Sequence, residues 1–175
     1  MNKENYYIEQ VEHFNNVFGK LNNKVPTLVN EKEANFIYDF ILEELDEYKE
    51  AYEKGDMVGI ADAFGDIMYV LSAGILAFGV KDKFKEIYDE IQASNMSKSC
   101  DTEEDAKQTC SSITTIKGIE THYEKVGDKY IVYRSSDRKV QKNIKYFRPN
   151  LKQFFNDEDL KRTSNDTKIG QPVNS

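Results

Sequence analysis

The chain has 175 residues, of which 39% are hydrophobic and 31% are charged, and we expect one soluble domain, or one domain with an insertion. Its net charge of -7 argues against general binding to nucleic acid, which requires a basic surface. The first residues contain no apolar run of the signal-peptide type, and two cysteines are too few for a disulfide framework. We therefore expect a cytoplasmic protein with reduced thiols.

Two helices are predicted before residue 56. The first covers residues 4–18, where apolar side chains recur at helical spacing. Asn30, with Glu33 three residues later, resembles a capping box and opens the second helix, which ends at Gly55. The apolar stripe of this second helix is Ala34, Ile37, Tyr38, Ile41, Leu45 and Tyr48.

The third predicted helix begins after Asp56, which can cap it, and ends at Gly79. Its residues are mostly small or apolar, apart from Asp62 and Asp66. The run is long enough to span a bilayer, but each Asp near the bilayer centre would cost about 2.5–3.5 kcal/mol. We therefore expect a buried helix of a soluble protein and no membrane span.

A fourth helix, capped by Asp82, completes a predicted antiparallel bundle over residues 1–98. Residues 99–142 are interpreted as a small αββ insertion, with a helix capped by Thr102 and a β-hairpin that turns at residues 127–128. Residues 143–160 return the chain to the bundle. Residues 161–175 are polar and without periodicity, and a disordered tail is expected there.

Carboxylates gather on the second and third helices. At 100° per residue, Glu44 lies about 60° from the middle of the apolar stripe and Glu47 about 120° on the same side. Asp62 and Asp66 are one turn apart on one face. A buried, ionised carboxylate is costly without a partner, and residues 57–80 contain no Lys or Arg.

Three kinds of partner would offset the cost of burying these carboxylates: a proton, a basic residue or a metal ion. Oxygen ligands favour Mg²⁺ or Mn²⁺, and we expect such a cation between the two helices. The alternative is that Asp62 and Asp66 act as caps or pair with a lysine from elsewhere in the chain, such as Lys98.

These motifs resemble those of the all-α nucleoside triphosphate pyrophosphohydrolases, the MazG-like superfamily, which includes the phosphoribosyl-ATP pyrophosphohydrolases. The sequence EELDE matches the first acidic motif at Glu43, Glu44 and Glu47. ADAFGD matches the second motif at Asp66, but Ala63 stands where the strict pattern has Glu, with Asp62 beside it. The stretches VEHFNNVFG, SNMSK and KYFRPNL add to the resemblance.

The resemblance implies an all-α, four-helix MazG-like bundle that assembles into a homodimer or tetramer. It implies Mg²⁺-dependent cleavage of a nucleoside triphosphate between the α and β phosphates, in housekeeping of the nucleotide pool. Glu44, Glu47, Asp62 and Asp66 would then hold Mg²⁺, or Mn²⁺ in its place, and Glu43 would hold a further metal or accept a proton from water.

Four more residues are candidates for substrate binding: Asn95, Lys98, Tyr146 and Arg148. The first two and Arg148 have side chains that bind phosphate or sugar, and the tyrosine is able to stack on a base. The alternatives are solvated side chains, a helix cap at Asn95 and core packing at Tyr146. A rival from another class is a catalytically degenerate dimerisation or regulatory protein on the same scaffold, which Ala63 favours.

Overall fold

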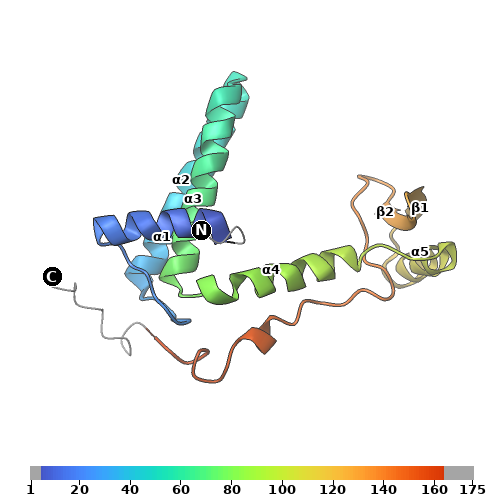
Figure 1. Cartoon of the computed structure of the whole chain (residues 1–175). Helices are drawn as coiled ribbons and strands as arrows, with labels where there is room; N and C mark the ends of the chain where they lie inside the picture. Colours follow the sequence, from blue (N-terminus) through green and yellow to red (C-terminus); the bar gives the residue numbers. More distant parts are fainter. Residues whose placement is uncertain (1–4, 164–175) are drawn as a thin grey trace. The chain divides into compact units, whose positions relative to one another are not determined.

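The computed structural model describes residues 5–163, which are mostly helical and form two compact units with separate cores. The first unit comprises residues up to 86 together with those from 152, and the second comprises residues 87–151. The elements in chain order are α1 (Tyr6–Phe18), α2 (Glu31–Lys54), α3 (Met57–Ala77), α4 (Lys81–Met96), α5 (Glu103–Lys117), β1 (Thr121–Val126), β2 (Lys129–Arg134) and the 3-10 helix η2 (Leu151–Phe154) (Figure 1).

The first unit is built on the hairpin of α2 and α3, which lie side by side (Figure 1). Gly55 ends α2 with a φ of 67°, a backbone conformation that favours glycine. Asp56 follows at once and caps α3, because its side chain accepts hydrogen bonds from the backbone N–H of Val58 and of Gly59. This short joint turns the chain back on itself, and Tyr48 of α2 stacks on Phe64 of α3 with ring centroids 5.1 Å apart.

α1 packs across α3 and supplies the rest of the core of the first unit (Figure 1). Ile8 and Val11 of α1 bury against Leu76 of α3, and Phe84 at the start of α4 packs on the same cluster. At the end of α3 the chain passes close to the loop before α2. Only glycine fits at Gly79, because its φ is 67° and a Cβ atom there would overlap the carbonyl oxygen of Val25.

The chain beyond residue 152 is fastened to the first unit by Asp159. Its carboxylate, 5% exposed, accepts hydrogen bonds from Lys83 at 2.6 Å and from Arg162 at 3.1 Å. The bond from Lys83 is the main reason that the pKa of Asp159 is lowered to about 2, so this side chain is ionised at neutral pH. Arg162 also donates to the carbonyl oxygen of Pro26, so the contacts with Lys83 and Pro26 join segments far apart in the sequence.

The second unit packs α5 against the β-hairpin. Its core consists of Cys100, Ala106, Ile113 and Val132, and both cysteines of the chain are free thiols. The predicted cap of α5 is confirmed, since the Thr102 side chain accepts from the N–H of Asp105. The predicted hairpin is also confirmed: Val126 pairs with Lys129 across Gly127, which has a φ of 62°.

The predicted cap of α2 is confirmed as well, because the Asn30 side chain accepts from the N–H of Glu33 at 2.9 Å. Asp82, however, does not cap the fourth helix. α4 begins at Lys81, so Asp82 lies inside its first turn. The expected domain boundaries stay predictions, and most of the expected disordered tail, residues 164–175, lies outside the described residues.

The prediction that α3 is buried is wrong for this single chain. Only 22% of its apolar window is buried, since α1 and α2 cover one side of the helix. Tyr38, expected in the apolar stripe of α2, is 63% exposed. By length and composition α3 would suffice to cross a membrane, but that test is also passed by core helices of soluble proteins.

Candidate active site

Five acidic residues lie along the seam between α2 and α3: Glu43, Glu44, Glu47, Asp62 and Asp66. The hairpin brings them together, because α2 and α3 are packed side by side on either side of a short joint. The other four carboxylates all lie close enough to raise the pKa of Glu44 by like-charge repulsion, with Asp66 the largest of these effects. The acids that were predicted to act together are therefore neighbours in space.

Glu44 is the most constrained member of this group. It is half-buried, and its Oε2 atom is fully buried without a hydrogen-bond partner. Within residues 5–163, no other buried side-chain nitrogen or oxygen lacks a partner in this way. Loss of hydration is the largest cause that raises the pKa of Glu44 above its ordinary value, ahead of repulsion by Asp66. An unpartnered carboxylate oxygen among further carboxylates matches the oxygen-donor set that Mg²⁺ or Mn²⁺ prefers.

The other four acids are exposed, which corrects the expectation that Asp62 and Asp66 are buried. The reason is that no described element of the chain covers the faces of α2 and α3 on which these four acids lie. The proposed pairing with Lys98 is not seen either, since Lys98 instead donates to the side chain of Asn95 at 2.7 Å. In the described part of the chain, no three acidic, histidine or cysteine side chains already converge as a metal cluster, so these exposed carboxylates would have to turn toward Glu44 to share an ion.

Ala63, which stands where the resemblance described above leads one to expect Glu, is 1% exposed. The neighbouring Asp62 is exposed and lies close enough to Glu44 to raise its pKa. Asp62 is thus the acid that this chain offers on α3 in addition to Asp66.

The four candidate substrate-binding residues all belong to the second unit. Asn95 and Lys98 are hydrogen-bonded to each other, and the positive charge of Lys98 contributes to lowering the pKa of Tyr146. The structure therefore brings these three together. Arg148 is exposed and makes no ion pair within the described residues.

Sequence reasoning missed Lys142, whose Nζ lies 4.3 Å from the ring centroid of Tyr146. The signal was present in the sequence as a basic run: residues 138–148 contain five Lys or Arg and no Asp or Glu. Lys139, Lys142, Lys145 and Arg148 are three residues apart, but the segment that contains them forms no helix, so this spacing does not predict which of them lie together.

Comparison with known proteins gives one family. The model of the phosphoribosyl-ATP pyrophosphohydrolase family matches residues 11–95. The matched stretch includes all five acids of α2 and α3, reaches Asn95 and stops before Lys98. No curated protein matches the chain. The similarity therefore covers the acidic part of the candidate site and leaves most of the basic part outside it.

Replacing Glu44 by Gln is expected to stabilise the metal-free protein at neutral pH. Because the folded-state pKa of Glu44 is raised, its ionisation lowers stability at pH values above that pKa, and this cost disappears as pH falls through it. Thermal unfolding in EDTA should show a higher midpoint for Glu44→Gln than for wild type at neutral pH. The difference should shrink toward about pH 4.

The matched control is Glu53→Gln, an exposed position on the same helix, which should change the midpoint little at any pH. A Glu44→Gln protein that is less stable than wild type at neutral pH would contradict the account, because it would mean that an attractive contact holds Glu44 in the apo protein.

Proposed function

Residues 11–95 place this chain in the phosphoribosyl-ATP pyrophosphohydrolase family, within the all-α MazG-like superfamily, and on that premise we propose its reaction. The family implies a pyrophosphohydrolase that acts on a nucleotide-like substrate. The proposed reaction is hydrolysis of a nucleoside triphosphate, or a related nucleotide, between the α and β phosphates. The products are a nucleoside monophosphate and pyrophosphate, and the proposed role is housekeeping of the cytoplasmic nucleotide pool.

The observation that carries the proposal is the unpartnered Oε2 atom of Glu44 beside four other carboxylates. A site of this charge repels a triphosphate unless a cation lies between them. The proposed cation is Mg²⁺, with Mn²⁺ as a substitute, held by Glu44, Glu47, Asp62 and Asp66. When bound, Mg²⁺ neutralises phosphate charge and lowers the pKa of a water molecule.

The remaining residues have roles that follow from their chemistry. Glu43 is exposed and lies next to Glu44, so its carboxylate is free to accept the proton of the attacking water. Lys98 and Arg148 are proposed to bind phosphate, Asn95 to bind phosphate or sugar, and Tyr146 to stack on a base. Catalysis of this kind depends mainly on positioning and on charge neutralisation.

A second function has one observation in its favour. Ala63 is buried where the family pattern has an acid, and a chain that lacks one ligand is a candidate for a degenerate, regulatory member of the same scaffold. Such a protein would keep the fold and the assembly but would not turn over nucleotides. Measurement of hydrolysis separates the two functions.

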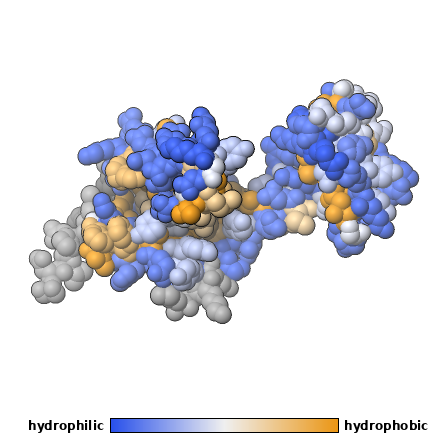
Figure 2. Space-filling model, turned by 90° about the horizontal axis from the view of Figure 1, so that it is seen from above, coloured by the Kyte–Doolittle hydropathy of each residue, from blue (hydrophilic) through white to orange (hydrophobic). Residues whose placement is uncertain are grey.

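We also propose that the chain forms a homodimer or tetramer, in which a second copy covers the open side of α3 and completes a four-helix MazG-like bundle. Apolar residues lie at the surface of the molecule (Figure 2). Those exposed on α2 and α3 include Phe36, Tyr38, Leu42, Leu45, Tyr52, Met57, Val58, Phe64, Met68 and Leu71. A soluble monomer rarely exposes so many large apolar side chains on adjacent helices.

Hydrolysis in ¹⁸O-labelled water, across ribo- and deoxynucleoside triphosphates with Mg²⁺, tests the reaction. The label is expected in the monophosphate, pyrophosphate should be the other product, and EDTA should stop turnover. Glu47→Gln should lower kcat/KM by at least about 100-fold, whereas Glu53→Gln should leave it near the wild-type value.

Label only in pyrophosphate would mean attack at the β phosphorus, and release of orthophosphate with a nucleoside diphosphate would mean attack at the γ phosphorus. Either result would contradict the proposed reaction. Absence of turnover with every nucleotide would favour the regulatory alternative.

Light scattering at micromolar concentration tests the assembly. A mass of at least two chains is expected, and simultaneous replacement of Met68 and Leu71 by Gln should lower it, because both are exposed apolar residues of α3. Replacement of the exposed Lys117 by Gln, in the second unit, is a control that should not change the mass. A monomeric wild-type protein would refute the proposed assembly.

A further inference from the structure

Two segments of the second unit, residues 94–99 and residues 143–147, are fastened together by hydrogen bonds. The hydroxyl of Ser94 donates to the carbonyl oxygen of Phe147 at 2.9 Å, and the N–H of Phe147 donates to the hydroxyl of Ser97 at 3.3 Å. The Asn143 side chain donates to the carbonyl oxygen of Ser99 at 2.7 Å. These contacts fix the end of α4 against the segment that follows the hairpin.

Side chains that bind anions gather on this frame. The Lys142 Nζ lies 4.3 Å from the Tyr146 ring centroid, the Tyr146 hydroxyl lies 3.4 Å from the hydroxyl of Ser94, and Lys98 donates to Asn95. The pKa of Tyr146 is lowered, first by its contact with the Ser94 hydroxyl and then by the positive charges of Lys142 and Lys98. Tyr146 thus contacts Lys142 and Ser94, and Lys98 is held by Asn95, the residue that follows Ser94 on α4.

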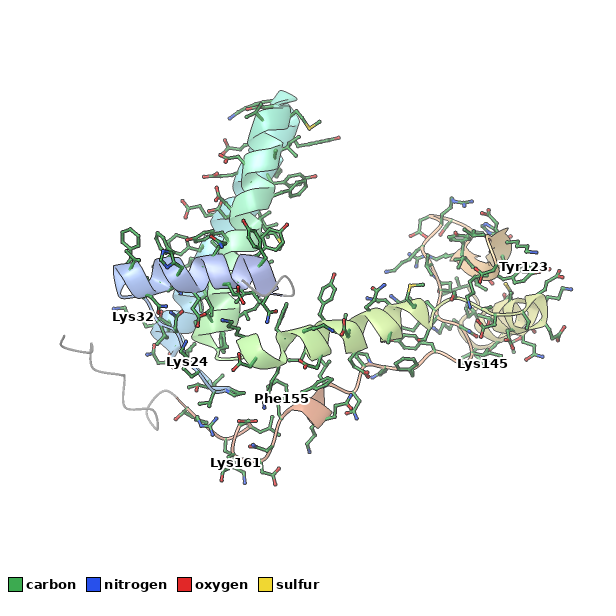
Figure 3. The ribbon with its side chains drawn as sticks, viewed as in Figure 1. Lys24, Lys32, Tyr123, Lys145, Phe155 and Lys161 are labelled. Atoms are coloured by element: carbon green, nitrogen blue, oxygen red, sulfur yellow. The ribbon has the colours of Figure 1, made fainter. Side chains whose placement is uncertain are left out.

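Neither of these two lysines is paired with a carboxylate in the part of the chain that the structure describes. Most basic residues around them are paired: Lys107 with Glu103, Lys129 with Asp101, Arg134 with Asp137, Arg138 with Glu124 and Lys145 with Asp105. Lys145 and Tyr123, which donates its hydroxyl to Glu103, are labelled in Figure 3. In a protein of net charge -7, two neighbouring lysines without acids create a local positive potential that attracts an anion.

We propose that Lys98, Lys142 and Tyr146 form a phosphate-binding site for the phosphate chain of the nucleotide substrate. Lysine supplies point charges to phosphate oxygens. Because Lys142 lies over the Tyr146 ring, this site uses the tyrosine hydroxyl, which donates one hydrogen bond to phosphate, in place of base stacking. The proposal gives the segment 99–142 a role, because Lys142, its last residue, belongs to the same site as Lys98. It rests on the proposed function for the identity of the ligand, and it requires only that the second unit bind a phosphate chain.

The test is a calorimetric titration of the full chain with inorganic pyrophosphate in EDTA. Without metal, the acids of α2 and α3 repel pyrophosphate, so binding reports on the basic site. Lys142→Gln should weaken binding about tenfold or more, because it removes a charge-assisted bond. Tyr146→Phe should weaken it less. Lys139→Gln, an equal loss of charge at an exposed position of the same segment, is the matched control and should change binding less than about twofold.

No binding by wild type at millimolar pyrophosphate, or equal weakening by Lys142→Gln and Lys139→Gln, would overturn the site. The link to substrate is tested by turnover: Lys142→Gln should raise KM for the nucleotide with kcat near wild type. An unchanged KM in an active enzyme would overturn the substrate assignment. If wild type has no turnover, the proposed function fails. The pyrophosphate titration still decides whether the phosphate-binding site exists.

Discussion

The central physical constraint in this structure is the free-energy cost of keeping the ionised Glu44 carboxylate between α2 and α3. Gly55 and Asp56 force the two helices into a tight hairpin, and that packing removes one oxygen of Glu44 from water without a hydrogen-bond donor in exchange. The four surrounding carboxylates raise the cost further. A buried polar atom of this kind is rare in folded proteins, and a divalent cation would convert its cost into binding energy.

The two units carry complementary chemistry. The first unit presents carboxylates suited to a cation, and the second presents lysines, a phenol and an amide suited to phosphate oxygens. The family match covers the acidic part, whereas Lys98, Lys142 and Tyr146 lie beyond it.

Local interactions were predictable from sequence and distant ones were not. The caps at Asn30, Asp56 and Thr102, and the hairpin turn at Gly127, each depend on residues within three positions, and all of them form as expected. Asp82 does not cap α4, because the helix already begins at Lys81 and Asp82 therefore lies inside its first turn. The exposure of α3 was missed because apolar composition does not reveal how much of a helix the other elements of the chain cover. Lys142 was missed because the ties between residues 94–99 and 143–147 span the whole insertion.

Binding of Mn²⁺ to the nucleotide-free protein, measured by electron paramagnetic resonance, tests the central claim most directly. Wild-type protein should bind Mn²⁺, Mg²⁺ should compete for the same site, and Glu53→Gln should bind as wild type does. Glu44→Gln should lose binding by at least about tenfold while remaining folded, because the substitution removes both the ligand charge and the repulsion. Equal Mn²⁺ binding by Glu44→Gln and wild type would contradict the account, since the buried carboxylate would then have no cation to explain it.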